Sequence, residues 1–548
     1  MIEPAAPTPQ ELEERFLTEG LWSAAETIPT LLARAARESP DSEAVVDDHG
    51  TRLSYGELAR RSSHLAAALA GRGIGPGDVV GVQLPNRAEA SVAACAIEKL
   101  GGIVNPLVPM YRERELIYAS NTCGSKALIV PGLFRRHDYD AMALKVAAEV
   151  PSLTTLVSLS EAPPPGVEAY DALLGEAAGS GTAEFDDPAL DPNAIAAVLF
   201  TSGTEADPKG ALHSHNTLLA NNRALAQILE LGRDDHIFMA SPVGHGTGYG
   251  FGLRLAIFLG SKLVLQETWQ PQDAARLISQ ERCAYTHAST PFAHDLLAVP
   301  GLDDLDLTSL RYFVTGGTSV PTGFAQLMKD QVGCLLLRLY GQTEAFMTTL
   351  NRPDDAFETL ETRDGRPVPG VEVQIWDDTG NRVDDGEEGE AACRGPHRCL
   401  GFLNDPERTR AAIDDEGWLR MGDLCTIDDR GYLTVVGRKK EVISRGGYKY
   451  SPREIEDILA LHPAVSRIAI VRATDERLGE KACAFVVTRD GHALSLDEIV
   501  DYLRGQGVAP FKWPERLEVV EALPTTASGK VQKFVLEQRL VDKQTRGR

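Results

Sequence analysis

Several short polar stretches, each beside an apolar run, carry residue types that could bind a phosphorylated nucleotide. The first, residues 201–210, follows the apolar run 194–200 and consists mainly of small, hydroxyl-bearing and glycine residues with one lysine, Lys209. Glycine permits positive φ, and small side chains let backbone N–H groups approach phosphate oxygens. The G-x-x-x-x-G-K-[ST] pattern of a Walker loop is absent. By composition alone, a plain turn is the commoner interpretation of such a stretch.

Two further stretches could hold the remainder of a nucleotide. Residues 340–344, Tyr-Gly-Gln-Thr-Glu, follow the apolar run 334–339 and so place an aromatic ring and an acid at the end of a predicted strand. Ligands bind at that end of the strands in open α/β sheets. Asp423 closes the Gly-containing stretch 417–423. An aspartate after glycine is usually a turn residue, but a carboxylate can also accept hydrogen bonds from both ribose hydroxyls.

The densest cationic stretch of the chain lies at 437–449, around a Gly-Gly turn. Directly after it, residues 451–454 (Ser-Pro-Arg-Glu) have the pattern of a capping box with proline at the first helical position, which predicts a helix with Ile455, Ile458 and Leu459 on its inner face. Lys530 ends a Thr/Ser/Gly segment and precedes a short amphipathic helix. Taken alone, it would be a surface lysine.

Net charge limits the classes of partner. The 548 residues include 55 Lys and Arg against 79 Asp and Glu, a net charge of −24. A surface this acidic repels phosphate backbones and anionic lipid, so neither a nucleic acid nor a membrane surface is an expected partner. An anionic ligand must therefore be held by a local patch of cations and N–H groups.

The eight cysteines are scattered, with no C-x-x-C pair, and read as buried reduced thiols. Residues 1–16 are acidic and lack the basic region and apolar run of a secretory signal. No apolar stretch reaches membrane-spanning length, since Glu98 and Lys99 interrupt the best one. We expect a cytoplasmic protein.

The elements that must position these residues follow an α/β pattern. Between 22 and 128, helical periods alternate with short β-branched runs, as in a mostly parallel sheet. The glycines at 71–77 fail the dinucleotide pattern because Pro76 occupies a required glycine position. Residues 160–193 shift to Pro, Gly, Ala and acid, which predicts a loop and a subdomain boundary. The residues after 451 read as a small α/β unit.

In order and spacing, these motifs resemble the adenylate-forming superfamily of acyl-CoA synthetases, standalone adenylation enzymes and firefly luciferases. The resemblance covers nearly the whole chain, from about 54 to 530, including connecting segments such as GYLTVVGRKKEVISRGGYKYSPREIE. It implies an α/β protein: a large N-terminal domain of two mostly parallel sheets with interleaved helices plus a small β-barrel, and a small mobile α+β C-terminal lid. The implied domains are 1–438 and 439–548, with the hinge at Lys440.

The resemblance also implies two reactions in one pocket. A carboxylate attacks the α-phosphate of ATP to give acyl-AMP and pyrophosphate; the lid then rotates, and a pantetheine thiol displaces AMP. The implied cofactors and substrates are ATP (or acyl-AMP), Mg²⁺ and CoA. Lys530 would bridge the carboxylate and the α-phosphate, Glu344 would hold Mg²⁺, and Thr343 would contact the α-phosphate.

The remaining roles are carried over by position. Asp423 and Arg438 would bind the ribose and Tyr340 would stack on adenine. The other implied nucleotide contacts are Thr201, Ser202, Gly203, Thr204, Lys209, Gly316, Gly317, Thr318 and Gly341. The implied CoA tunnel consists of Arg445, Gly446, Gly447 and Lys449.

The implied acyl pocket lies at 240–252. His245 matches the family's gating histidine, and His213 and His215 read as structural rather than as metal ligands. No carboxylate or amide stands where relatives pair an ammonium or a catechol, so an apolar acid is favoured. Gly244, Gly246, Gly248 and Gly250, with Gly252, would leave room for it; loop mobility explains the same glycines equally well.

Two positions depart from the family pattern. Glu205 and Ala206 stand where Thr and Gly are usual, and Met421 where Thr is usual. An acid beside a polyphosphate predicts a weak ATP half-reaction. The sequence thus favours an acyl-CoA ligase for a bulky hydrophobic carboxylic acid. A standalone adenylation enzyme that loads a carrier protein, a non-catalytic adenylate-binding protein, an adenylating partner enzyme and a homodimer all stay open.

Overall fold

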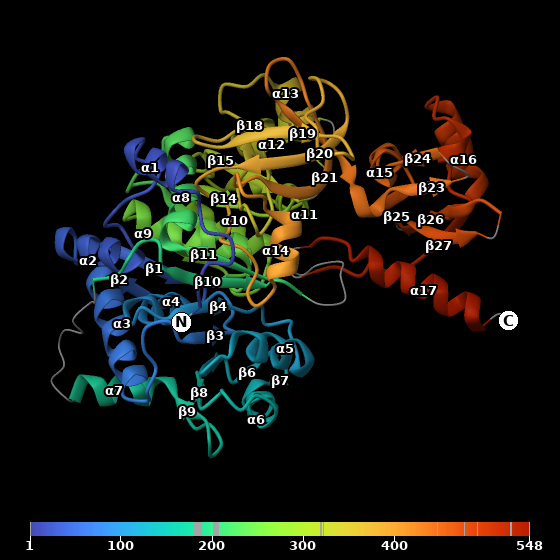
Figure 1. Ribbon diagram of the computed structural model, residues 1–548. Coiled ribbons are helices and arrows are strands. Elements are labelled where there is room, and N and C mark those ends of the chain that lie inside the picture. Colours follow the sequence, from blue (N-terminus) through green and yellow to red (C-terminus); the bar gives the residue numbers. More distant parts are fainter. Residues whose placement is uncertain are drawn as a thin grey trace.

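The computed structural model describes residues 2–179, 189–200, 208–317, 320–321, 323–445, 448–475, 477–489, 492–526 and 529–546 (Figure 1). Within these ranges, strands and helices alternate through the first two thirds of the chain, as the sequence predicts. None of the helices in the described ranges combines the length and apolar character that a bilayer crossing requires.

The larger of the two main sheets has nine strands, and its six central strands are parallel. It carries β16, which ends at Tyr340, and β15, which ends at Gly316, as neighbours. Its strands in spatial order are β18 (Arg366–Pro367), β17 (Thr349–Leu350), β16 (Leu335–Tyr340), β15 (Tyr312–Gly316), β14 (Cys283–His287), β12 (His236–Met239), β13 (Leu263–Leu265), β1 (Glu43–Asp47) and β2 (Arg52–Ser54).

The second main sheet has seven strands, of which only β11 is antiparallel to its neighbour. Its order is β11 (Gly210–Ser214), β10 (Ile195–Phe200), β4 (Ile103–Pro106), β3 (Val79–Val82), β5 (Ala127–Val130), β8 (Thr155–Ser158) and β9 (Glu168–Ala169). A separate two-stranded hairpin, β6 (Leu133–Phe134) and β7 (His137–Asp138), lies beyond β5 in the chain.

The main hydrophobic core joins the two sheets through helices. One cluster of buried side chains contains Val80 and Val104 of the seven-stranded sheet, Ile237 and Leu336 of the nine-stranded sheet, and buried residues of α4, α8 and the π-helix η1. The helices of this part of the chain are α1 (Gln10–Thr18), α2 (Ile28–Glu38), α3 (Tyr55–Ala70), α4 (Ala88–Lys99), α5 (Glu113–Cys123), α6 (Tyr139–Glu149), α7 (Tyr170–Gly179), α8 (His215–Leu229), η1 (Thr247–Arg254), α9 (Leu255–Leu259), α10 (Pro271–Gln280), α11 (Thr290–Leu297), η2 (Leu302–Asp304), α12 (Phe324–Val332), α13 (Phe357–Thr362) and α14 (Pro406–Ala412).

A four-stranded antiparallel sheet follows, where the resemblance implies a small barrel. It consists of β19 (Glu372–Trp376), β20 (Gly389–Arg394), β21 (Leu419–Ile427) and β22 (Leu433–Arg438). Residues 439–441 then form the short 3₁₀ turn η3 (Lys439–Glu441). Alternate residues of β21 are buried, which sets Met421, Asp423 and Cys425 on the inner face of the strand.

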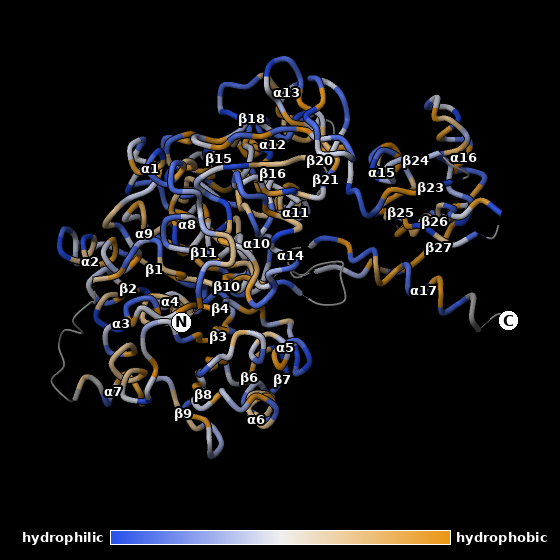
Figure 2. The backbone as a smooth tube through the Cα atoms, viewed as in Figure 1, coloured by the Kyte–Doolittle hydropathy of each residue, from blue (hydrophilic) through white to orange (hydrophobic). Residues whose placement is uncertain are grey.

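The C-terminal unit stands to one side of the rest of the molecule in Figure 1. Its sheet contains β23 (Ile443–Arg445), β24 (Tyr448–Tyr450), β25 (Val465–Asp475), β26 (Gly479–Thr488) and β27 (Arg516–Val519). Its helices are α15 (Pro452–Leu459), α16 (Leu496–Gly505), η4 (Pro510–Lys512) and α17 (Lys533–Arg546). Hydrophobic and hydrophilic positions alternate along α17 (Figure 2), and Leu536 and Leu540 are its buried residues. This is the amphipathic helix that the sequence predicts after Lys530.

Two local predictions need correction. The stretch 160–193 contains β9 and α7 rather than loop alone, and the strands on either side of it, β8 and β10, belong to the same seven-stranded sheet. The prediction of loop alone is therefore wrong, while the subdomain boundary stays a prediction. The helix at 452 begins as predicted, but Ser451 accepts a hydrogen bond from the N–H of Arg453 instead of closing a capping box, because Glu454 pairs with Lys512 on η4. All eight cysteines are buried and free, as predicted.

Candidate active site

A short hairpin carries Lys530 from the C-terminal unit into the N-terminal part of the protein. The hairpin is closed by the Thr525–Val531 bridge and by the Gln532 N–H, which donates to the Pro524 carbonyl at 2.8 Å. The Lys530 side chain lies against Gly317: a Cβ at Gly317 would stand 2.6 Å from Nζ. Gly317 has φ +77°, so both its backbone conformation and this close approach require glycine. The structure thus brings together two residues that are more than 200 positions apart in the sequence.

The electrostatic surroundings of Lys530 are the predicted nucleotide residues. Burial lowers the pKa of Lys530, and the field of Arg438 lowers it further, whereas Asp423 and Glu344 act in the opposite direction. These four residues come from the C-terminal hairpin, β22, β21 and the turn after β16. A cation held among two carboxylates and a second cation is well placed to meet a phosphate group and a carboxylate together.

Asp423, Tyr340 and Arg438 form one hydrogen-bonded group. Asp423 and Arg438 are register partners on β21 and β22, and the guanidinium Nε lies 3.1 Å from Oδ1 of Asp423. The Tyr340 hydroxyl donates to Oδ2 at 3.0 Å. Burial raises the pKa of Asp423, and Arg438 opposes that rise. Asp423 is buried, while the Arg438 side chain is 45% exposed and so could reach a ligand.

Glu344 lies in the turn after β16 and is buried. Burial raises the pKa of its carboxyl group, and Lys209 and Arg438 oppose the rise. The main-chain carbonyl of Thr343 accepts a hydrogen bond from Nε2 of His213 at 2.9 Å, and Nδ1 of His213 faces the Thr217 hydroxyl at 3.2 Å. These contacts support the structural role that the sequence predicts for His213. The ammonium of Lys209 lies 5.2 Å from the centre of the Phe402 ring.

His245 lies just ahead of the π-helix η1, beside His287 at the end of β14. Burial lowers the pKa of His245 to about 4, with Lys530 as the second cause. Burial lowers the pKa of His287 to about 3, with His245 as the second cause. Both imidazoles are therefore neutral near pH 7. Nδ1 of His287 is buried without a hydrogen-bond partner in the structure.

The glycines of 244–252 are packed against other parts of the protein instead of bordering open space. A Cβ at Gly248 or Gly244 would collide with the carbonyl of Pro242 or Leu107, and one at Gly250 would lie 2.5 Å from Cε1 of Phe346. Gly246 alone of the four predicted pocket glycines has ordinary clearance, with Phe346 Cζ 3.5 Å from a notional Cβ. Whether these glycines border the acyl group stays a prediction.

Phe346 packs its ring against Gly250 and Gly246. It has φ +39°, which is unusual for a bulky residue and marks a locally strained backbone. Its ring meets Phe251 of η1 at 5.8 Å and His213 at 5.2 Å between centroids, and Phe251 in turn meets His287 at 4.8 Å. An apolar wall of Phe346 and Phe251 thus runs from Gly246 toward His287.

A fully buried ion pair fixes the far end of η1. Arg254 Nη1 lies 2.5 Å from Oε1 of Glu98 on α4, and the Tyr249 hydroxyl donates to the same oxygen at 2.8 Å. Both side chains of the pair have no exposed surface. His215 Nδ1 lies 3.6 Å from Oε2 of Glu98. This group ties η1, and with it Phe251, to α4.

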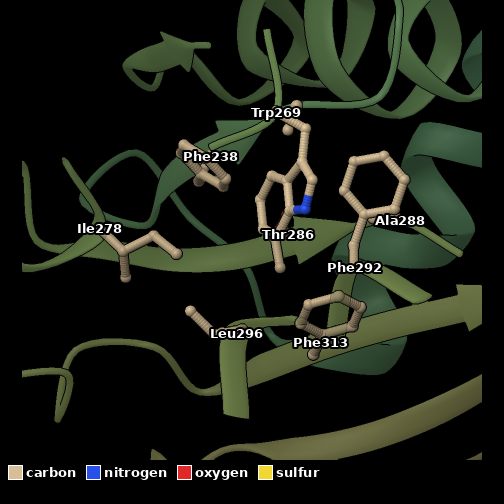
Figure 3. Close-up of a pocket in the computed structure, with 9 residues that line it drawn as sticks. Phe238, Trp269, Ile278, Thr286, Ala288, Phe292, Leu296 and Phe313 are labelled. Atoms are coloured by element: carbon tan, nitrogen blue, oxygen red, sulfur yellow. The ribbon is translucent and has the colours of Figure 1, made fainter. Parts of the chain in front are cut away.

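A separate apolar cavity lies on the other face of the nine-stranded sheet, under α10 and α11 (Figure 3). The Trp269 ring projects into it beside Phe238 and Phe292. Thr286 lines this cavity, whereas its neighbour His287 meets Phe251. Successive strand residues point to opposite faces, so the cavity and the Phe346 wall are on opposite sides of the sheet.

The remaining predicted residues are placed as follows. Lys440 lies in η3 and is exposed. Arg445 and Lys449 lie on the β23–β24 hairpin, where Arg445 pairs with Glu515. Gly316 abuts the Leu339 carbonyl of β16, and Gly341 abuts the main chain of Phe346. Thr201, Ser202, Gly203, Thr204, Glu205, Ala206, Thr318, Gly446 and Gly447 lie outside the described residues.

Sequence reasoning missed Phe346, Phe251, His287 and the Glu98–Arg254 pair. Phe346 follows the Tyr-Gly-Gln-Thr-Glu stretch by two positions, and this proximity was its only signal. Glu98 did give a signal, because it interrupts an apolar helix, but its partner is 156 residues away. No local pattern could identify that partner.

The chain is similar to known proteins along nearly its whole length. Residues 32–403 match the family model "AMP-binding enzyme", and residues 454–530 match "AMP-binding enzyme C-terminal domain". A medium-chain fatty-acid–CoA ligase of Escherichia coli is 38% identical over 97% of this chain and 93% of that protein. A 2-hydroxy-7-methoxy-5-methyl-1-naphthoate–CoA ligase of Streptomyces carzinostaticus is 33% identical over 97% of this chain and 96% of its own. The ATP-bound crystal structure of MatB from Rhodopseudomonas palustris superposes with a TM-score of 0.84 at 28% identity, over 94% of this chain and 99% of that one.

Proposed function

The chain belongs to the AMP-binding enzyme family, as an AMP-forming acid–thiol ligase, and on that premise we propose that it joins a hydrophobic carboxylic acid to CoA through an acyl-AMP intermediate. The observation that carries the proposal is the Lys530 side chain, which lies against Gly317 among Asp423, Glu344 and Arg438. A lysine from the C-terminal unit is thereby held beside the residues of the N-terminal part that we propose to bind the nucleotide.

In the first half-reaction, a carboxylate oxygen of the acid bonds to the α-phosphorus of ATP, and the bond to the β-phosphate oxygen breaks to release pyrophosphate. Lys530 would bind the acid oxygen and an α-phosphate oxygen, and so offset the charge that builds up between them. Asp423 would accept hydrogen bonds from the ribose hydroxyls, and Arg438 would hold Asp423 in place. Tyr340 would present its ring to adenine while its hydroxyl stays on Asp423.

Glu344 suits a magnesium ion that is bound mainly by phosphate and water. It offers a single buried carboxylate, whose pKa is raised by burial and lowered by the fields of Lys209 and Arg438. The described ranges contain no cluster of three or more His, Cys, Asp or Glu residues that could hold a metal without substrate. Mg²⁺ in such a site would neutralise phosphate charge. Glu344 would orient it, with Lys209 and Thr343 facing the phosphates.

In the second half-reaction, the thiol of CoA loses its proton to solvent and its sulfur bonds to the acyl carbon. The bond between the acyl carbon and the oxygen that bridges it to phosphorus breaks, and AMP leaves with that electron pair. We propose 1–438 and 439–548 as the two moving units, with the hinge at Lys440, since the four-stranded sheet ends at Arg438 and the next begins at Ile443. Arg445 and Lys449, with Gly446 and Gly447, would border the CoA path.

The acid is proposed to be apolar because the wall near His245 consists of Phe251, Phe346 and Gly246, and both His245 and His287 are held neutral by burial. No carboxylate among these residues could pair with a substrate ammonium. The E. coli and Streptomyces relatives named above take a medium-chain fatty acid and a naphthoate. Both acids are hydrophobic, which supports the same class for this chain.

A mass-spectrometric screen tests the proposal. Straight-chain and aromatic acids are supplied with ATP, Mg²⁺ and CoA, and in parallel with a carrier protein; we expect a CoA thioester and AMP. Lys530→Ala should lower acyl-AMP formation by at least about 100-fold, the scale of a lost transition-state contact, and should affect thioester formation from supplied acyl-AMP far less. Acylation of the carrier protein alone would identify a carrier-loading enzyme, and adenylate binding without turnover would identify a non-catalytic protein.

A further inference from the structure

Lys533, the first residue of α17, is held by two carboxylates within the C-terminal unit. Its Nζ lies 2.8 Å from Oε2 of Glu441 and 2.9 Å from Oε1 of Glu456. Glu441 ends η3, and Glu456 lies on α15. The three side chains are mostly covered, with exposed fractions of 14% for Lys533, 25% for Glu441 and 16% for Glu456. We call Lys533, Glu441 and Glu456 the carboxylate clamp.

Within the carboxylate clamp, the lysine and the two carboxylates each stabilise the charged form of the other. Burial alone would lower the pKa of Lys533, but the two carboxylates raise it above its ordinary value. Burial raises the pKa of Glu456, while Lys533 and the Ile470 N–H, which donates to Glu456 Oε1 at 2.5 Å, act in the opposite direction. Covered charges are strongly destabilising when one partner is removed. Lys533 is therefore fixed in position, unlike a surface lysine.

The carboxylate clamp lies at the base of the hairpin that carries Lys530. Lys533 directly follows Gln532, whose N–H closes the hairpin on Pro524. The hairpin is small: the Thr526 N–H donates to the Lys530 carbonyl at 2.8 Å, and the Lys530 N–H donates to the Thr526 hydroxyl at 3.2 Å. A displacement of its base must therefore displace Lys530.

The other end of the carboxylate clamp lies close to the nucleotide residues. Glu441 is three positions after Arg438, which is paired with Asp423. Lys533 in turn is three positions after Lys530. The ion pair between Glu441 and Lys533 thus connects the segment that carries Arg438 with the segment that carries Lys530. Both Arg438 and Lys530 act on the electrostatics of Asp423.

We propose that Lys533 is a positioning residue for acyl-AMP formation: by binding Glu441 and Glu456 it fixes the base of the hairpin, so that Lys530 reaches the α-phosphate. The proposal rests on the function proposed above and adds a residue that contacts neither the acid nor ATP. All three members of the carboxylate clamp lie beyond Lys440, so they move together if the unit rotates there. The carboxylate clamp then serves only the half-reaction that uses Lys530.

The test compares the two half-reactions in Lys533→Met. Misplacing a reacting group by about 1 Å can cost about 100-fold, so pyrophosphate release should fall about 10- to 100-fold, while thioester formation from supplied acyl-AMP should stay within about twofold. The KM for ATP should change less than kcat, because Lys533 is placed away from the nucleotide. Lys533→Arg, which keeps the charge, should recover most of the pyrophosphate release.

Two variants separate positioning from a general loss of stability. Arg472→Met removes another ion pair of α17, that of Arg472 on β25 with Glu537, whose atoms lie 3.1 Å apart. It should leave the ratio of the two half-reactions unchanged. In Lys533→Met combined with Glu456→Gln, the more buried of the two carboxylates left without Lys533 is also neutralised, so part of the lost thermal stability should return while pyrophosphate release stays low.

Hydrogen exchange provides a readout that does not depend on turnover. In Lys533→Met, the amides of Thr526, Gly529, Lys530 and Gln532, which are hydrogen-bonded within the hairpin, should exchange faster than in the wild type. In Arg472→Met they should not. Unchanged exchange in Lys533→Met, equal losses in both half-reactions, or recovery of pyrophosphate release in the double variant would overturn the proposal. Failure of the proposed function would be seen separately, as a wild-type protein that forms neither acyl-AMP nor thioester.

Discussion

Replacing Phe346 with alanine should let the enzyme accept longer acids. The Phe346 ring covers Gly250, lies next to Gly246 and meets Phe251, so its removal leaves a space that continues the apolar wall beside His287. In Phe346→Ala, each methylene of the acid that fills this space should contribute about 0.8 kcal/mol, which corresponds to roughly fourfold in kcat/KM. An acid three carbons longer than the best wild-type substrate should therefore gain roughly 50-fold relative to that substrate.

The variant also has a predictable cost in stability. Removing a buried phenyl group destabilises a protein by about 3 to 5 kcal/mol. Phe346→Gly should lose less, because the φ of +39° that strains phenylalanine is acceptable to glycine. Both variants should nevertheless show the same shift toward longer acids.

The assay measures kcat/KM for thioester formation over a series of straight-chain acids. Phe313→Ala is the matched control: Phe313 is also buried, but it lines the apolar cavity on the other face of the sheet (Figure 3). It should cost stability without changing chain-length preference. If Phe346→Ala altered all acids equally, or if Phe313→Ala produced the shift instead, the acyl group would not lie along the Phe346 wall.

Three further predictions concern pocket size, the ATP step and pH. Gly246→Leu should raise KM for bulky acids, by an amount equivalent to about 1 to 3 kcal/mol of binding free energy, and should leave KM for small acids unchanged, since Gly246 has clearance from Phe346. An equal change in KM for acids of every size would instead indicate that the glycines serve loop mobility. A carboxylate about 6 Å from a phosphate charge costs about 3 kcal/mol at an effective dielectric near 20, so pyrophosphate release should be slower than thioester formation from synthetic acyl-AMP, and Glu205→Thr should speed it; rapid release by the wild type would contradict this. Burial lowers the pKa of His213 to about 4 and that of His287 to about 3. As the pH falls, these histidines therefore become protonated in the unfolded chain before they do so in the folded protein. The free energy of unfolding in urea should therefore fall as pH is lowered from 7 to 5, by about 1 to 2 kcal/mol per histidine, and a pH-independent value would refute the assignment.

The sequence by itself determined the parts of this protein that depend on neighbouring residues. The apolar run before Tyr340 becomes β16, and residues 452–459 become α15. Such features are readable because strands, caps and turns are set by residues a few positions apart. The roles proposed for Lys530 and Asp423 rest on the order of the motifs, because each residue alone is ambiguous.

Only the tertiary structure decided which distant side chains meet. The predicted room beside Gly250 is taken up by Phe346, and the buried charge of Glu98 is balanced by Arg254, 156 positions away. Lys533 looks like a solvent-facing lysine at the start of an amphipathic helix until Glu441 and Glu456 are seen against it. Contacts of this kind depend on how the sheets and the C-terminal unit pack, and long-range packing leaves no periodicity in one sequence, so residue types alone could not reveal them.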